Sequence, residues 1–145
     1  MKLLVIADSH GEINLLNKIF NDNKNVDIFI HLGDSELPPY LLNNYVCVKG
    51  NMDFYEYPLE RDLLTPYGII HLEHGNKYID KNKLNNYFMF LSGHTHIKRV
   101  SKFNNTYIFN PGSLTRPRDS NKGSYLIIDI KSKDEVSYNF VDVDL

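Results

Sequence analysis

Three short apolar runs in the first half of the chain each stop abruptly at polar residues. The runs cover residues 2–7, 27–32 and 45–48. Runs of this length, rich in leucine and β-branched residues and bounded by glycine, are typical of buried strands. Apolar residues recur at helical spacing from Glu12 to about Asp22, and a brief helix is expected from Pro38 to Asn44. This alternation of strand and helix predicts βαβ units with parallel pairing.

The second half of the chain predicts mostly strands. Its expected strands are residues 59–65, 68–72, 88–91, 98–103, 106–109, 124–130 and 136–143. One helix near Asp80 to Tyr87 interrupts them, and short turns such as Asn104-Asn105 indicate hairpins. The pattern predicts a single α/β domain over residues 1–145, with a front half that leans parallel and an antiparallel back half.

Composition narrows the class of protein. The chain has 145 residues, of which 42% are hydrophobic and 23% charged, as in globular domains. Cys47 is the one cysteine, so no internal disulfide can form and a reducing compartment is expected. No apolar run approaches the ~18–20 residues of a membrane span, and we expect a cytoplasmic protein without a membrane partner. The net charge of −2 without a basic stripe argues against an extended nucleic-acid surface.

Side chains that can bind metal ions follow five of the expected strands. They are Asp8, His10, Asp34, Asn51, His74, His94 and His96. Ligands of α/β sheets bind in the crevice beyond the carboxyl ends of strands, so these side chains are expected to converge. Imidazole and oxygen donors without thiolate suit manganese, iron, zinc or nickel. Seven donors exceed the needs of one tetrahedral ion, which favours two ions that share a carboxylate.

Each of these motifs has an ordinary structural explanation when it is taken alone. Asp8-Ser9-His10 could precede a helix as an N-cap region, and Gly33-Asp34 and Gly50-Asn51 are common turn dipeptides. Gly93-His94-Thr95-His96 is more specific, because two histidines directly after an apolar strand are uncommon. The combination, in this order and at strand ends, favours the metal site.

In this combination the chain resembles the calcineurin-like metallophosphoesterase superfamily. The residues that carry the resemblance are D-S-H at 8–10, G-D at 33–34, G-N at 50–51, H-G at 74–75 and G-H-T-H at 93–96. G-N-M-D at 50–53 and N-P-G-S-L-T-R-P-R at 110–118 resemble the small YfcE-type phosphodiesterase branch. The resemblance implies a four-layer αββα sandwich of two mixed sheets, whereas the strand pattern alone leaves one or two sheets open.

The resemblance also implies two divalent ions, with manganese expected first and nickel, zinc or iron as alternatives. Asp8, His10, Asp34 and His96 would hold one ion; Asp34, Asn51, His74 and His94 would hold the other. Asp34 would bridge the two. A hydroxide bridging both ions would attack a small or nucleotide-like phosphodiester in line, with Asn51, His10 and Asp34 as catalytic residues.

Position 52 departs from the pattern of many superfamily members, which have histidine after the G-N asparagine. Met52 cannot transfer a proton, and losing such a group typically lowers rates ~10²–10⁴-fold. His10 could substitute in part. Arg116 and Arg118 are candidates for clamping a substrate phosphate, with a solvated loop paired to acidic residues as the alternative.

Two further histidines lie inside apolar runs. His31 and His71 are interpreted as core residues or as residues that support the ligands. A binding module that resembles the metallophosphoesterase-like retromer subunit, with little or no catalysis, is the alternative function. It would use an exposed apolar surface to which Met52, Phe54, Tyr55 and Tyr57 contribute. A homodimer through an apolar strand edge stays open.

Overall fold

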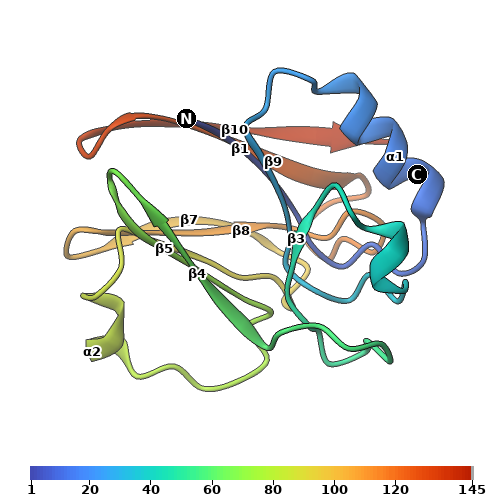
Figure 1. Cartoon of the computed structure of the whole chain (residues 1–145), viewed down its shortest axis with the longest axis horizontal. Coiled ribbons are helices and arrows are strands. Elements are labelled where there is room, and N and C mark those ends of the chain that lie inside the picture. The colour runs from blue at the N-terminus through green and yellow to red at the C-terminus, as the bar shows by residue number, and fades with distance from the viewer. Residues whose placement is uncertain (145) are drawn as a thin grey trace.

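Two five-stranded mixed sheets pack face to face in the computed structural model, in which residues 1–144 are described (Figure 1). Sheet A has the strand order β10-β9-β1-β2-β3, and sheet B has the order β4-β5-β6-β8-β7. The strands of sheet A are β1 (Lys2–Ile6), β2 (Ile28–His31), β3 (Val46–Cys47), β9 (Gly123–Ser132) and β10 (Glu135–Val143). Those of sheet B are β4 (Glu60–Thr65), β5 (Gly68–Glu73), β6 (Met89–Leu91), β7 (Lys98–Phe103) and β8 (Thr106–Pro111).

The β1 strand is buried on both faces, which explains its continuous apolar sequence. Leu3 and Val5 belong to the core between the two sheets, where they share a cluster with Ile70 and Leu72 of β5. Leu4 and Ile6 alternate with them and belong to the cluster that includes α1 (Ile13–Asp22). The two-residue side-chain period thus divides one strand between two cores.

The helical layers are thinner than the resemblance implies. Helix α1 lies over the outer face of sheet A, and α2 (Lys81–Leu84) lies beside the outer face of sheet B (Figure 1). The expected helix over 80–87 therefore shortens to one turn, since Asn85 and Asn86 favour turns over helix. The expected helix over 38–44 is the 3₁₀ turn η1 (Pro39–Leu41). Within the described part of the chain, no helix has the length and apolarity to cross a membrane.

The prediction of an antiparallel back half is wrong in part. In sheet B, β5 pairs in parallel with β6, and β6 pairs in parallel with β8. The antiparallel pairs are β4 with β5 and β7 with β8, the latter joined by the predicted turn at Asn104-Asn105. The connections make these pairs parallel. The chain returns through α2 between β5 and β6, and through β7 between β6 and β8, so each of the three strands starts from the same end of the sheet.

Candidate metal centre

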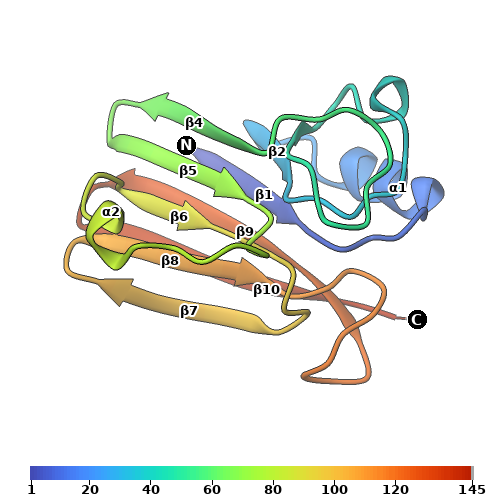
Figure 2. The same ribbon diagram turned by 90° about the horizontal axis from the view of Figure 1, so that it is seen from below.

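The seven predicted ligands follow the carboxyl ends of β1, β2, β3, β5 and β6. In Figure 2, β1, β5 and β6 run in the same direction toward this end of the molecule. Backbone hydrogen bonds join the loops, because the N–H of Asp8 donates to Gly33 O and that of Gly93 donates to His74 O. The two sheets therefore deliver their loops to one place, as the sequence predicted.

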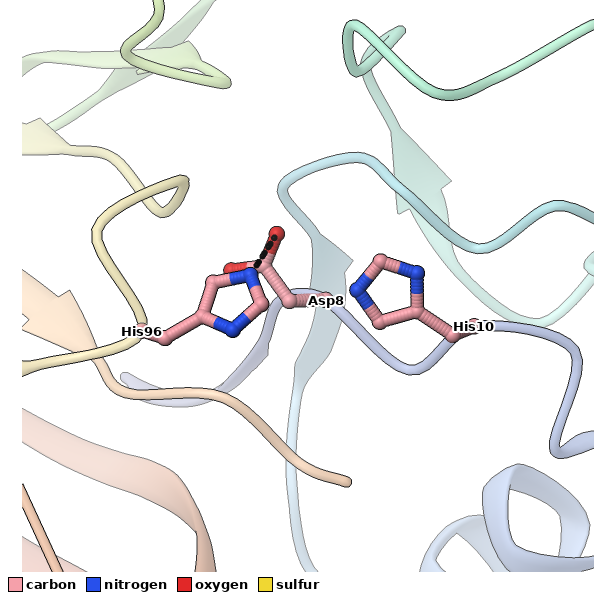
Figure 3. A group of neighbouring side chains, drawn as sticks. All are labelled: Asp8, His10 and His96. Atoms are coloured by element: carbon pink, nitrogen blue, oxygen red, sulfur yellow. Dashed lines mark ion pairs between the residues drawn. The ribbon is translucent and has the colours of Figure 1, made fainter. Parts of the chain in front are cut away.

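Asp8, His10 and His96 form the first donor cluster, in which the Asp8 carboxylate lies between the two imidazole rings (Figure 3). His96 Nε2 lies 3.5 Å from Asp8 Oδ1, and the ring centroids of His10 and His96 are 5.6 Å apart. The Nδ1–H of His96 donates to Arg116 O at 2.6 Å, which leaves Nε2 free to bind an ion.

Asp8, Asp34 and His74 form the second donor cluster. His74 Nε2 lies 3.2 Å from Asp34 Oδ2 and 3.7 Å from Asp8 Oδ1. The Nδ1–H of His74 donates to Leu32 O at 2.8 Å, so this ring also presents Nε2. Asp8 is common to both clusters, whereas the resemblance assigned the shared position to Asp34. That bridging role stays a prediction.

Asn51 and His94 complete the set at its solvent side. His94 Nδ1 lies 3.1 Å from Asn51 Oδ1 and 3.3 Å from His74 Nε2. Contacts thus connect all seven predicted residues into one group, and their individual roles as ligands stay predictions.

Two buried donor atoms in this group fit a metal ion. Asp8 Oδ1 and His10 Nε2 have no hydrogen-bond partner within the described residues, although both are shielded from solvent. An unpaired buried polar atom costs about 1–3 kcal/mol of folding free energy. Two such atoms in one cluster indicate that a binding partner belongs there. A divalent cation satisfies a carboxylate oxygen and an imidazole nitrogen together.

Burial dominates the electrostatics of the centre. It raises the pKa of Asp8 to about 7, with His74 opposing and Asp34 adding to the rise. For Asp34, burial acts upward on the pKa, but hydrogen bonds from His74 and from the Met52 N–H lower it below its ordinary value. A cation placed between these two carboxylates would favour the charged form of both.

The backbone at the ligands is strained. Asp8, His10, Asp34, His94 and His96 all have a positive φ, between 48° and 71°. This region costs a non-glycine residue roughly 1–2 kcal/mol, and such strain collects at functional sites. These left-handed turns lie in the loops that follow β1, β2 and β6, and the sequence pattern could not reveal them.

Two polar residues, to which the sequence pattern assigns no function, stabilise the loops of the predicted ligands. Asp53 accepts the backbone N–H groups of Asp34, Glu36 and Gly50 at distances of 2.7–2.9 Å. Asn110 donates to Gly93 O at 2.9 Å and so anchors the loop that carries His94 and His96. In the sequence, Asp53 is the last residue of the G-N-M-D motif and Asn110 is the first residue of N-P-G-S, and neither motif indicates this supporting role.

The two arginines lie beside the centre with exposed side chains. Neither Arg116 nor Arg118 forms an ion pair within residues 1–144, so the alternative of a salt-bridged loop receives no support. Burial lowers the pKa of His94 and of His96, and the charge of Arg118 lowers both further. The backbone N–H of Arg118 donates to His96 O at 3.0 Å, so this residue adjoins the centre.

The remaining polar residues are structural. His31 is fully buried; its Nδ1 accepts the Gly33 N–H and its Nε2–H donates to Ser9 Oγ at 2.8 Å. Burial, together with the charge of His74, lowers the His31 pKa to about 3. The Ser113 hydroxyl donates to Asp8 O, and burial raises the pKa of the Cys47 thiol to about 12. All three side chains are buried.

Comparisons with known proteins agree with the geometry. Residues 1–133 match the family model described as the calcineurin-like phosphoesterase superfamily domain. The chain is 34% identical over 155 residues to YsnB of Bacillus subtilis, named a probable metallophosphoesterase, covering 98% of this chain and 91% of YsnB. A conserved Streptococcus pneumoniae protein, itself a predicted phosphoesterase, superposes with a TM-score of 0.82 at 27% identity over 97% of both chains.

Two more distant structures share the fold. An archaeal phosphodiesterase superposes with a TM-score of 0.73 at 20% identity, over 99% of this chain and 100% of that one. A Vps29 variant from Entamoeba histolytica superposes with a TM-score of 0.71 at 21% identity, over the same shares. The family model and the Bacillus relative together cover nearly the whole chain. The chain therefore belongs to the calcineurin-like phosphoesterase superfamily.

Proposed function

We propose that the protein is a phosphodiesterase that uses two divalent metal ions, with manganese expected first, and that hydrolyses a small or nucleotide-like phosphodiester. The observation that carries the proposal is the position of Asp8, which is common to both donor clusters. Its Oδ1 is buried, has no hydrogen-bond partner within the described residues, and lies 3.7 Å from His74 Nε2 and 3.5 Å from His96 Nε2. A carboxylate shared by two clusters supports two ions held close together, as in two-metal sites for phosphoryl transfer.

The residues assigned to the ions combine these clusters with the family resemblance. Asp8, His10, Asp34 and His96 would hold one ion, and Asp34, Asn51, His74 and His94 would hold the other, with Asp34 expected to bridge. When bound, such ions lower the pKa of water and neutralise charge on phosphoryl oxygens. The carbonyls of Leu32 and Arg116 fix the ring orientation of His74 and His96, so these two ligands need no rearrangement.

Substrate would be held at the open side of the centre. The exposed Asn51 amide can donate to a phosphoryl oxygen, because its Oδ1 faces His94. The guanidinium groups of Arg116 and Arg118, which form no ion pair within residues 1–144, can bind phosphate oxygens in a bidentate manner. Met52 is 56% exposed and offers no proton. We therefore expect the enzyme to favour esters whose leaving group departs without protonation, such as aryl phosphodiesters.

The test is hydrolysis by metal-stripped protein, using an aryl phosphodiester and an aryl phosphomonoester with manganese, nickel, zinc or magnesium restored one at a time. The proposal expects diester cleavage that depends on added metal and is faster than monoester cleavage. Asn51→Ala and Asp34→Ala should be folded and far less active. A metal-loaded protein that cleaves neither ester would refute the proposal.

A scaffold without catalysis is the second candidate. It is favoured by the side chains of Met52 and Phe54, which are 56% and 90% exposed beside the centre, and by the Vps29 fold. Met52→Ser/Phe54→Ser separates the two candidates. A scaffold would lose a partner and show no turnover, whereas the enzyme would keep its metal-dependent turnover of a small diester.

A further inference from the structure

We propose that the hairpin β4–β5 carries a separate, peripheral site for one divalent cation of the zinc class, held by Glu60, His71 and Glu73. This site is distinct from the centre described above and does not rest on the proposed function. The three residues offer donor atoms that all lie within 4.8 Å of one another.

The register of the hairpin brings these side chains together. Glu60 of β4 pairs with Glu73 of β5, and Asp62 pairs with His71 two residues along. Positions 60 and 62 share a face of β4, as positions 71 and 73 share a face of β5, because side chains alternate along a strand. The result is a two-by-two array of three carboxylates and one imidazole on one face.

His71 is held as a metal-binding histidine is. Its ring is buried, stacks on Tyr87 and Phe90 with centroid distances of 4.6 Å and 5.1 Å, and places Nδ1 2.6 Å from Asp62 Oδ1. A histidine ligand usually donates its second nitrogen to a carboxylate in this way, which fixes the ring and the tautomer. The other nitrogen, Nε2, lies 2.8 Å from Glu73 Oε1.

The array has an excess of negative charge. Glu60 and Glu73 face each other directly across the strands, an arrangement of like charges that destabilises a sheet. Lys77 and Lys83 line the adjoining cavity, yet in residues 1–144 no lysine or arginine forms an ion pair with Glu60, Asp62 or Glu73. A proton on His71 would supply one positive charge against three carboxylates, so a further cation has an electrostatic role here.

The donor types and the space select the ion. Imidazole nitrogen and carboxylate oxygen are both zinc ligands, and a site with three protein ligands leaves the fourth position to water. Ligand atoms around tetrahedral zinc are about 3.3 Å apart for bonds of ~2.0–2.1 Å, so the present Nε2 to Oε1 separation needs only a small widening. The cavity of about 170 Å³ beside Glu60, His71 and Glu73 has room for the ion and its water.

The charge on His71 is consistent with this arrangement. Burial acts downward on its pKa, but hydrogen bonds to Glu73 and Asp62 outweigh burial and raise the pKa above its ordinary value. The cluster thus favours a positive charge at the imidazole edge. Zn²⁺ binds the neutral imidazole, so its binding would release a proton held there.

The test compares the number of Zn²⁺ ions bound by intact, metal-stripped protein in equilibrium dialysis. Wild type is expected to bind one Zn²⁺ per chain more than Glu60→Gln/Glu73→Gln, which keeps the size and polarity of both side chains. Glu12→Gln/Glu135→Gln, two exposed acidic residues elsewhere, should bind as wild type does. The count is a difference between variants, so it is informative whether or not the main centre binds two ions or hydrolyses any ester.

A second readout protects the test against misfolding of the double variant. In the ¹⁵N-imidazole spectrum of wild type, Zn²⁺ should shift the His71 Nε2 resonance. In the single variant Glu60→Gln, which changes an exposed residue, the same shift should need at least tenfold more Zn²⁺. Equal Zn²⁺ counts in wild type and the double variant, or a His71 resonance that Zn²⁺ leaves in place, would overturn the proposal and leave an ion-paired histidine.

Discussion

The Asp53 carboxylate accepts the backbone N–H of Asp34 at 2.9 Å and so links the loop after β3 to the loop after β2. The same carboxylate accepts the N–H groups of Gly50 and Glu36. Asp53→Ala would leave buried donors without an acceptor, at about 1–3 kcal/mol each. We expect a large loss of stability in urea unfolding and weaker metal binding. Glu56→Ala, whose side chain is 97% exposed, is the matched control and should leave both unchanged.

Gly50 has no room for a side chain. An added Cβ would overlap Asp34 Oδ1 and the Asp34 backbone nitrogen. Gly50→Ala is therefore expected to displace a predicted ligand and to abolish binding of at least one ion. Gly11→Ala is the comparison, because its Cβ would meet nothing within 4 Å and only its φ of +87° is unfavourable. That variant should lose roughly 1–2 kcal/mol of stability and keep its metal ions. Isothermal titration measures the Mn²⁺ affinity of each variant. Equal affinities for Gly50→Ala and Gly11→Ala would contradict the packing argument.

The raised pKa of Asp8 predicts how the metal-free protein responds to pH. Burial raises this pKa to about 7 from 3.8, so between those values the folded state keeps a proton that the unfolded state releases. The free energy of unfolding should therefore fall as pH rises through this window, by a few kcal/mol at most. Urea unfolding in a chelator at about pH 5 and about pH 8 measures the fall. Asp8→Asn cannot titrate and should show a clearly smaller fall; an equal fall would assign it to other groups.

Arg118 is predicted to act on substrate rather than on metal. Its positive charge lowers the pKa of His94 and of His96. Its side chain is exposed and makes no ion pair in the described chain. Arg118→Ala should raise the KM for an aryl phosphodiester about tenfold, the usual size of a lost charged hydrogen bond, with unchanged ion content. The exposed Lys131→Ala serves as control. A variant with wild-type KM and fewer bound ions would reverse this assignment.

The positions of the candidate ligands were predictable from the sequence because each follows an apolar run that stops abruptly. Asp8 directly follows the first run, Asp34 follows the second run after Gly33, and His74 follows its run after Glu73. The convergence of these ends follows from a general property of α/β sheets. Most strand boundaries were predicted closely for the same reason, since strands buried on both faces have continuous apolar sequences.

The contacts that hold the loops of the predicted ligands in place could not be predicted in this way. The link from Asp53 to Asp34 joins residues 19 positions apart and depends on the three-dimensional path of two loops. The positive φ values at Asp8 and His96 leave no mark on composition, because such strain is imposed by surrounding contacts. The parallel pairing of β5, β6 and β8 also escaped the pattern, which reports burial and says little about strand direction.

The most direct measurement is an electron paramagnetic resonance titration of metal-stripped protein with Mn²⁺. Two ions that share a carboxylate lie ~3.5–4 Å apart, close enough for their spins to couple. The account predicts a spin-coupled pair of Mn²⁺ ions at saturation, and its loss in Asp8→Asn, because Asp8 is common to both donor clusters. A spectrum of isolated Mn²⁺ ions alone, or a coupled pair that persists without the Asp8 carboxylate, would contradict it.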